Sequence, residues 1–143
     1  QAELTVPVLV AGDLFGSSIA VDGDTVIVGA PGTVVSGMTS HGVAYVFVRN
    51  GSVWTLQATL TAIETVADDF FGVAVAIKGD TAVVSSTFAN GDKGAAYVFT
   101  RDRERGKRKQ APVQHDGRTL ARLGAAGYRR IAVAKLLVTG ASA

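Results

Sequence analysis

An internal repeat constrains the fold of this chain more than any other feature. Residues 13–25 (DLFGSSIAVDGDT) and 69–81 (DFFGVAVAIKGDT) align without a gap at an offset of 56. Residues 42–49 (GVAYVFVR) and 94–101 (GAAYVFTR) align at an offset of 52, so the second copy is four residues shorter between the two blocks. Loops tolerate such changes in length. A fixed period of this size predicts structural units that stack on one another.

Each copy has the pattern of short β-strands. Residues 17–21 and 25–28 alternate, and Asp22-Gly23 between them predicts a tight hairpin turn because glycine tolerates a positive φ. Lys78-Gly79 has the same place in the second copy. Residues 44–48 are β-branched and aromatic, which predicts a central strand covered on both faces.

A fourth strand is predicted after the turn at Asn50-Gly51. There Trp54, Leu56, Ala58 and Leu60 alternate with polar residues, which indicates one buried face. Four strands joined by short turns make one blade of a propeller. We therefore predict an all-β fold of tandem four-stranded antiparallel blades of an incomplete β-propeller, followed by an aberrant basic C-terminal segment.

The motifs at the start of the first copy resemble a known family. Phe15-Gly16 followed by Gly29-Ala30-Pro31 is similar to the signature of FG-GAP repeats, the blades of integrin α-subunit propellers and of many exported bacterial proteins. The second copy keeps Phe71-Gly72 but has Ser85-Ser86-Thr87 in place of Gly-Ala-Pro, so we expect the tight turn there to be relaxed. The resemblance covers about residues 12–101.

Packing explains the residues of this signature best. We expect both phenylalanines to lie in the core between blades and the glycines that follow them to allow close approach of backbones. The structural signature of the repeat is Phe15, Gly16, Gly29, Ala30, Pro31, Phe71 and Gly72.

The repeat pattern is lost after Arg101. At an offset of 52, the apolar positions of the fourth strand map onto Gly106, Arg108, Gln110 and Pro112, and proline cannot donate to a strand ladder. Residues 1–100 hold three basic and nine acidic residues, whereas residues 101–143 hold eleven basic and three acidic ones. Three interpretations of this segment stay open: an eroded third blade around 131–133, a basic helix over 120–137, or a stretch read out of frame.

These patterns divide the chain into four parts: residues 1–11 as an N-terminal strand or linker, 12–62 as the first blade, 63–101 as a second blade that lacks a clear fourth strand, and 102–143 as a basic tail with a degenerate third blade as one interpretation. A closed propeller needs at least four blades. We therefore expect the chain to be a fragment of a longer propeller, or to associate with further blades.

The sequence contains no recognisable metal or catalytic site. Loops 32–41 and 88–93 offer only Asn90 and Asp92 as oxygen ligands of those types, so neither calcium nor another cofactor is expected. The two histidines, His41 and His115, stand in no catalytic context, and the neighbouring Asp68 and Asp69 are interpreted as a polar loop. Four further aspartates are interpreted as turn formers that bond nearby backbone amides: Asp22, Asp24, Asp80 and Asp92.

The family resemblance implies a non-catalytic binding or adhesion scaffold, extracellular or at the cell surface, with a protein or glycan as ligand. The alternatives are binding of nucleic acid or another polyanion through the basic segment, or a damaged gene product without a function of its own. Residues 25–48 carry no charge and are long enough to cross a bilayer, but glycine and proline interrupt them. They are therefore expected to form two strands and a loop rather than a membrane span.

Overall fold

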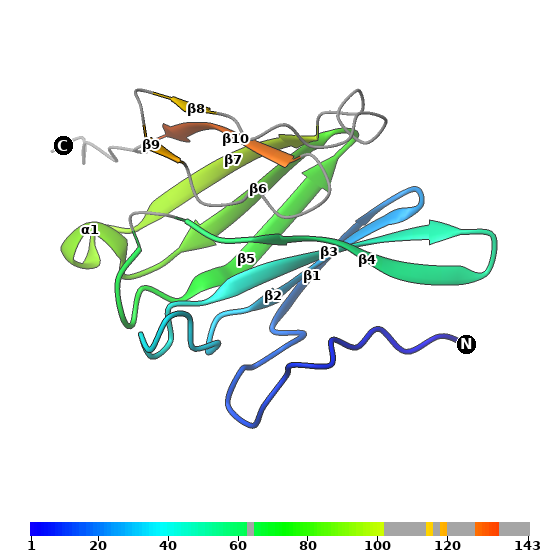
Figure 1. Ribbon diagram of the computed structural model, residues 1–143, viewed down its shortest axis with the longest axis horizontal. Coiled ribbons are helices and arrows are strands. Elements are labelled where there is room, and N and C mark those ends of the chain that lie inside the picture. Colours follow the sequence, from blue (N-terminus) through cyan, green and yellow to red (C-terminus); the bar gives the residue numbers. More distant parts are fainter. Residues whose placement is uncertain (63–64, 102–113, 116–117, 120–127, 135–143) are drawn as a thin grey trace, which may run out of the picture.

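The two copies of the repeat fold into two antiparallel sheets (Figure 1). The computed structural model describes residues 1–62, 65–101, 114–115, 118–119 and 128–134. The first sheet has the order β1-β2-β3-β4 and consists of β1 (Ser18–Asp22), β2 (Thr25–Ala30), β3 (Val43–Asn50) and β4 (Val53–Leu60). The second has the order β10-β7-β6-β5 and consists of β5 (Phe71–Lys78), β6 (Thr81–Ser86), β7 (Ala95–Arg101) and β10 (Tyr128–Ala134). The prediction of an all-β fold is confirmed, whereas the propeller stays a prediction.

The remaining elements are short. A single turn, α1 (Ala89–Asp92), lies in the connection between β6 and β7, and within it Asn90 and Gly91 have left-handed backbone. β8 (Gln114–His115) and β9 (Arg118–Thr119) pair with each other. Residues 128–134 of the segment for which a helix was one interpretation form a strand, β10, because their backbone pairs antiparallel with β7.

Glycine turns fix the register of both first hairpins, as predicted. Asp22 pairs with Thr25 across the turn at Gly23, whose φ is 56°. Lys78 pairs with Thr81 across Gly79, whose φ is 55°. Because the turn chemistry is the same, β1–β2 and β5–β6 run in corresponding registers.

The apolar stripe predicted for β4 is split by a β-bulge. Val46 pairs with Ala58 while Phe47 pairs with Leu56, so Gln57 is the extra residue on β4. Ala58 remains buried, but Leu56 lies beyond the bulge and is exposed. The prediction of one continuous buried face was therefore wrong, because an inserted residue moves the side chains beyond it to the other face of the sheet.

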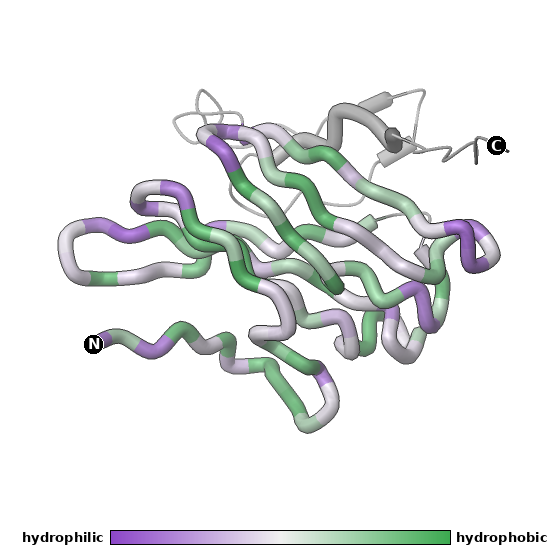
Figure 2. The backbone as a smooth tube through the Cα atoms, turned by 180° about the vertical axis from the view of Figure 1, so that it is seen from behind, coloured by the Kyte–Doolittle hydropathy of each residue, from purple (hydrophilic) through white to green (hydrophobic). Residues whose placement is uncertain are grey.

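The main hydrophobic core lies between the two sheets. β5 lies against β1 and β2, and apolar residues collect along the central strands while the hairpin tips are hydrophilic (Figure 2). The buried cluster is made of Ile27, Ala44, Val46, Ala58, Leu60 and Ala62 from the first copy and Phe71, Ala82, Val84, Tyr97 and Phe99 from the second.

Each unit contains the same group of three aromatic rings. Phe15 lies 5.8 Å from Tyr45 with a tilted geometry, and Phe71 lies 5.4 Å from Tyr97 at almost the same tilt. The edge-to-face contacts with Phe47 and Phe99 correspond as well. Such pairs stabilise a core beyond their buried area. The two phenylalanines are thus equivalent in contacts but not in burial, since Phe71 is fully buried and Phe15 half-buried.

A second buried cluster covers the face of the first sheet that points away from the second sheet. It contains Tyr45 and Phe47, with Leu4, Val6 and Leu9 from the N-terminal segment packed against the same side. Figure 1 shows this segment running beside the first sheet as an extended coil, and residues 1–11 contain no strand. The chain before the first repeat therefore covers part of a face that would otherwise be open.

We predict that Phe71→Ala destabilises the protein far more than Phe15→Ala. The ring of Phe71 is 0% exposed in the core between the sheets, and removal of a buried phenylalanine side chain costs about 3–5 kcal/mol. Phe15 is only half-buried, so we expect about 1–2 kcal/mol there. Urea unfolding of both variants measures the difference, and equal losses would contradict the assignment of the main core.

Candidate functional site

The signature glycines mark the place where the two sheets approach most closely. A Cβ on Gly72 would overlap the carbonyl oxygen of Val43, and a Cβ on Gly29 would overlap the carbonyl oxygen of Gly72. Gly16 has a φ of 93° and Gly72 a φ of 94°, but nothing lies within 4 Å of a Cβ built on Gly16. The two glycines share a backbone conformation and differ in whether another sheet faces them.

Gly29 serves this contact and not a turn. It lies inside β2, paired with Ser18 and Ala44, and Ala30 and Pro31 after it are buried. The expectation of a relaxed turn at Ser85 is therefore corrected: Ser85 lies within β6 and pairs with Ala74. Glycine is needed at position 29 because no side chain fits between the sheets there.

A buried aspartate closes the loop before each Phe-Gly pair. The Asp13 carboxylate accepts the Val10 backbone N–H at 3.0 Å, and the Asp69 carboxylate accepts the Val66 N–H at 2.7 Å. Both side chains are buried. Burial, followed by the charge of Asp13, raises the pKa of the Tyr45 phenol above its ordinary value. This role was not predicted, although both copies carry the same signal, an aspartate two positions before the Phe-Gly pair.

Two of the aspartates interpreted as turn formers have longer-range partners instead. The Asp22 carboxylate accepts the backbone N–H of Gly79, in the second unit, at 2.5 Å. Asp24 forms an ion pair with Arg49 at 2.7 Å, and the Arg49 guanidinium lies 5.5 Å from the Trp54 ring. Only their position at a turn could be predicted from the sequence, because the partner of Asp22 comes from the other unit.

His41 is a buried structural residue that joins the two units. Its Nε2 lies 2.6 Å from the Thr65 hydroxyl oxygen, and that hydroxyl donates to the Ala62 carbonyl at 2.8 Å. His41 and Thr65 are 3% and 4% exposed, as little as residues of the hydrophobic core. The Nδ1 of His41 also lies 3.3 Å from the Gly42 carbonyl oxygen, so both ring nitrogens and the Thr65 hydroxyl have buried partners. His115 lies in β8, on a different strand pair.

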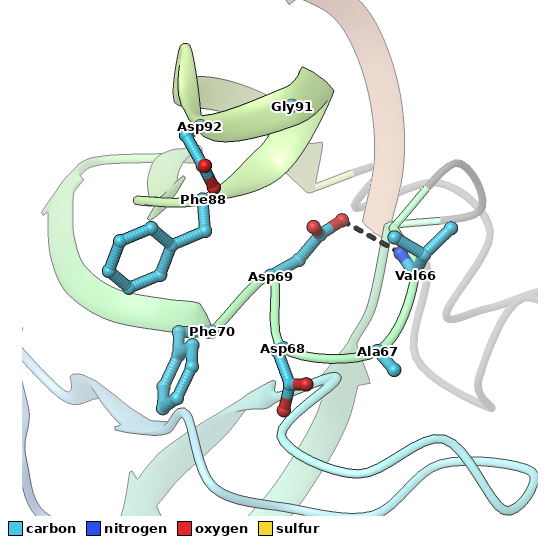
Figure 3. Close-up of a pocket in the computed structure, with 8 residues that line it drawn as sticks. All are labelled: Val66, Ala67, Asp68, Asp69, Phe70, Phe88, Gly91 and Asp92. Carbon is cyan, nitrogen blue, oxygen red and sulfur yellow. Dashed lines mark hydrogen bonds between the residues drawn. The ribbon is translucent and has the colours of Figure 1, made fainter.

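A pocket of about 450 Å³ opens at the loop end of the second sheet (Figure 3). The loop before β5 and the connection that contains α1 form its walls. Phe70 and Phe88 meet edge to face at 5.6 Å, and the ring of Phe88 is 48% exposed. Figure 3 shows Asp69 turned toward Val66 and its neighbour Asp68 turned to the opposite side of the loop. The lining residues are Val66, Ala67, Asp68, Asp69, Phe70, Phe88, Gly91 and Asp92.

The chemistry of this pocket suits binding. Asp69 is occupied by the Val66 N–H, and the Asp68 carboxylate lies 3.5 Å from the Thr39 hydroxyl on the other side of the loop, while Asp92 is an exposed carboxylate at the rim. An exposed aromatic ring beside carboxylates can hold a cationic group through ion pairing and cation–π attraction. Among the described residues, no three histidine, aspartate or glutamate side chains come together as metal ligands. In the same part of the chain, no helix has the length and apolarity to span a membrane.

Comparison with protein families gives a match over most of the described chain. A family model described as FG-GAP repeat matches residues 1–47 and again residues 54–99. The first match covers the N-terminal segment with β1, β2 and most of β3, and the second covers most of β4 with β5, β6 and most of β7. Each match therefore begins before its Phe-Gly pair and ends in the third strand of its sheet. A search of curated proteins found no match.

We predict that Thr65→Val lowers the free energy of unfolding by about 1–3 kcal/mol, because it leaves the His41 ring and the Ala62 carbonyl buried without their partner. The replacement keeps the shape of the side chain. Thr59→Val on the exposed side of β4 is the matched control and should change stability little. Equal effects in denaturant unfolding would show that the buried hydrogen bonds do not matter.

Proposed function

Because the chain belongs to the FG-GAP repeat family, we propose that it is a non-catalytic binding scaffold of extracellular or cell-surface type that takes part in adhesion. FG-GAP repeats are generally found in binding and adhesion proteins of the propeller type, typically extracellular. The family is generally non-enzymatic. These tendencies support the proposal at the level of function class.

The observation that carries the proposal is the division of the molecule into a rigid frame and an irregular end. The frame consists of two sheets that share one buried core. At one end the loops carry left-handed backbone at residues such as Asp68, Phe70, Asn90 and Asp92, and they surround the pocket. Loops held on a rigid frame are where binding residues concentrate.

The ligand group best suited to this pocket is a lysine or arginine side chain of a protein partner. The rim carries the carboxylate of Asp92, and Phe88, which also lines the pocket, is 48% exposed. Residues 1–100 hold nine acidic and three basic residues, so the surroundings also favour a positively charged partner. A glycan ligand would use the same aromatic ring but would gain nothing from the carboxylate charges.

We predict that the protein binds a lysine- and arginine-rich peptide. Phe88→Ala combined with Asp92→Asn should weaken this binding about five- to tenfold, because the free energies of one cation–π contact and one exposed ion pair are lost together. Fluorescence anisotropy at several salt concentrations measures the affinity. Glu3→Gln removes the same charge from the exposed N-terminal segment and should change the affinity less than twofold.

Two results would speak against the proposal. Equal weakening by Glu3→Gln would mean that the peptide responds to net charge and not to the pocket. Binding of heparin in place of the basic peptide, lost on deletion of residues 102–130, would favour the alternative of a polyanion binder that acts through the basic segment.

A further inference from the structure

The contact between the two sheets uses different groups on its two sides. The first sheet contributes the Ser18 hydroxyl, which donates to the Gly72 carbonyl at 2.8 Å, and the Asp22 carboxylate, which accepts from the Gly79 N–H. It also contributes Gly29, which leaves room for the Gly72 carbonyl. The second sheet contributes backbone groups of its Phe-Gly segment and of its first turn. We call the first set of groups the Ser-Asp-Gly side of the contact and the second set the Phe-Gly side.

The long loop between β2 and β3 belongs to the Ser-Asp-Gly side. Its carbonyls at Thr39, Ser40 and His41 accept the backbone N–H groups of Asp68, Phe70 and Phe71 at 2.8, 2.9 and 3.1 Å. A Cβ on Gly42 at the end of this loop would overlap the backbone of Phe71. The loop therefore fastens the first unit to the second along the entire Phe-Gly segment.

The second sheet has no Ser-Asp-Gly side on its own outer face. The residues equivalent to Ser18, Asp22 and Gly29 are Ala74, Lys78 and Ser85. Alanine cannot donate the hydrogen bond, lysine cannot accept one from a backbone N–H, and the side chain of Ser85 fills the space that an incoming carbonyl would need. Each of the three changes removes a contact seen between the existing sheets.

The connection between the second and third strands is four residues shorter in the second copy, which also removes contacts with a following unit. Twelve residues separate β2 from β3 but only eight separate β6 from β7, and the shorter connection contains α1. A Cβ on Gly94, the equivalent of Gly42, would come within 3.3 Å of the Thr87 carbonyl, in its own loop. This connection folds back on its own unit instead of reaching toward a following one.

The first sheet, in contrast, keeps a complete Phe-Gly side on its outer face. Gly16 and Gly23 have the φ values of Gly72 and Gly79 within about one degree, and a Cβ on either would meet nothing within 4 Å. Ile19 and Val21 are 64% and 65% exposed. Their equivalents, Val75 and Ile77, are partly buried against the main core.

Residues 1–6 already occupy one part of this Phe-Gly side. Their sequence, QAELTV, corresponds at an offset of 56 to QATLTA, residues 57–62 at the end of the first unit. Leu60 and Ala62 pack into the core between the sheets, and Leu4 and Val6 pack in the same way against the outer face of the first sheet. The N-terminal segment thus lies where the last strand of a further unit would end.

We propose that repeat units add to this protein from one side only. The outer face of the first sheet, made of Phe15, Gly16, Ile19, Val21 and Gly23, is the docking surface for another four-stranded unit. That unit must carry serine, aspartate and glycine at the places of Ser18, Asp22 and Gly29. The outer face of the second sheet accepts no such unit, so the stack ends there. This proposal does not depend on the ligand pocket.

The test inserts a second copy of residues 7–62 after residue 6, so that the added unit precedes the original one and presents its own Ser18, Asp22 and Gly29 to the docking surface. We expect one cooperative unfolding transition whose m-value is about 1.5 times that of the native chain, because m scales with the surface buried. The control carries Gly29→Ser in the added unit alone. Two separate transitions in the insertion protein, or no effect of the control, would overturn the proposal.

Chemical labelling gives an independent readout, since the chain contains no cysteine. Val21→Cys, placed in the original unit, should react rapidly with iodoacetamide in the native chain and at least about tenfold more slowly in the insertion protein, as for a mostly buried thiol. Ser52→Cys at an exposed turn should react equally in both. Equal rates at position 21 would overturn the proposal.

The one-sidedness is tested in the chain of native length, which also covers the case in which the insertion protein does not fold. Gly29→Ser should lower the urea midpoint strongly, whereas Ser85→Gly should change it less than half as much, because among the described strands β6 has its main contacts with β5 and β7 of its own sheet. The native chain should also sediment as a monomer at all concentrations. Association that Val98→Lys abolishes would show that the second sheet docks as well, and would overturn the proposal.

Discussion

The approach of the Gly72 carbonyl to Gly29 is the contact on which the arrangement of the two sheets depends. Any side chain at position 29 would overlap this oxygen, so the distance between β2 and β5 is set by backbone and not by side-chain size. Ser18 satisfies the same oxygen with a hydrogen bond of 2.8 Å. A buried carbonyl without a partner would be costly, and the serine removes that cost where the sheets are closest.

Close contact at this point brings the aromatic rings into the core. Phe71 directly precedes Gly72 and is fully buried, in tilted contact with Tyr97 and edge-to-face contact with Phe99. The left-handed backbone at Gly72 turns the chain so that the ring points inward while the carbonyl faces β2. The Phe-Gly pair therefore combines a ring that fills the core with a backbone position that only glycine adopts without strain, which explains why both copies contain it.

The sequence predicted the units, the strands and the hairpin turns because these depend on local chemistry. Alternation marked β1 and β2, and glycine marked the turns at Gly23 and Gly79. It failed where a residue acts across the contact between units. The roles of Asp22 and Gly29 depend on a backbone that lies more than 40 residues away, and one inserted residue at Gln57 reversed the side chains beyond it. The pocket was missed because its two walls come from separate loops, joined by the contact of Phe70 with Phe88.

The differences between the two copies carry as much information as their identity. If the second unit were a simple duplicate, Ser85 would be glycine and the loop before β7 would be four residues longer. Instead the loop forms α1 and contributes Phe88 and Asp92 to the pocket. The same shortening that removes the reach toward a following unit thus builds a wall of the proposed binding site. In the proposed one-sided stack, the last unit can use its loop in this way, because that loop would not have to bind the Phe-Gly segment of a following unit.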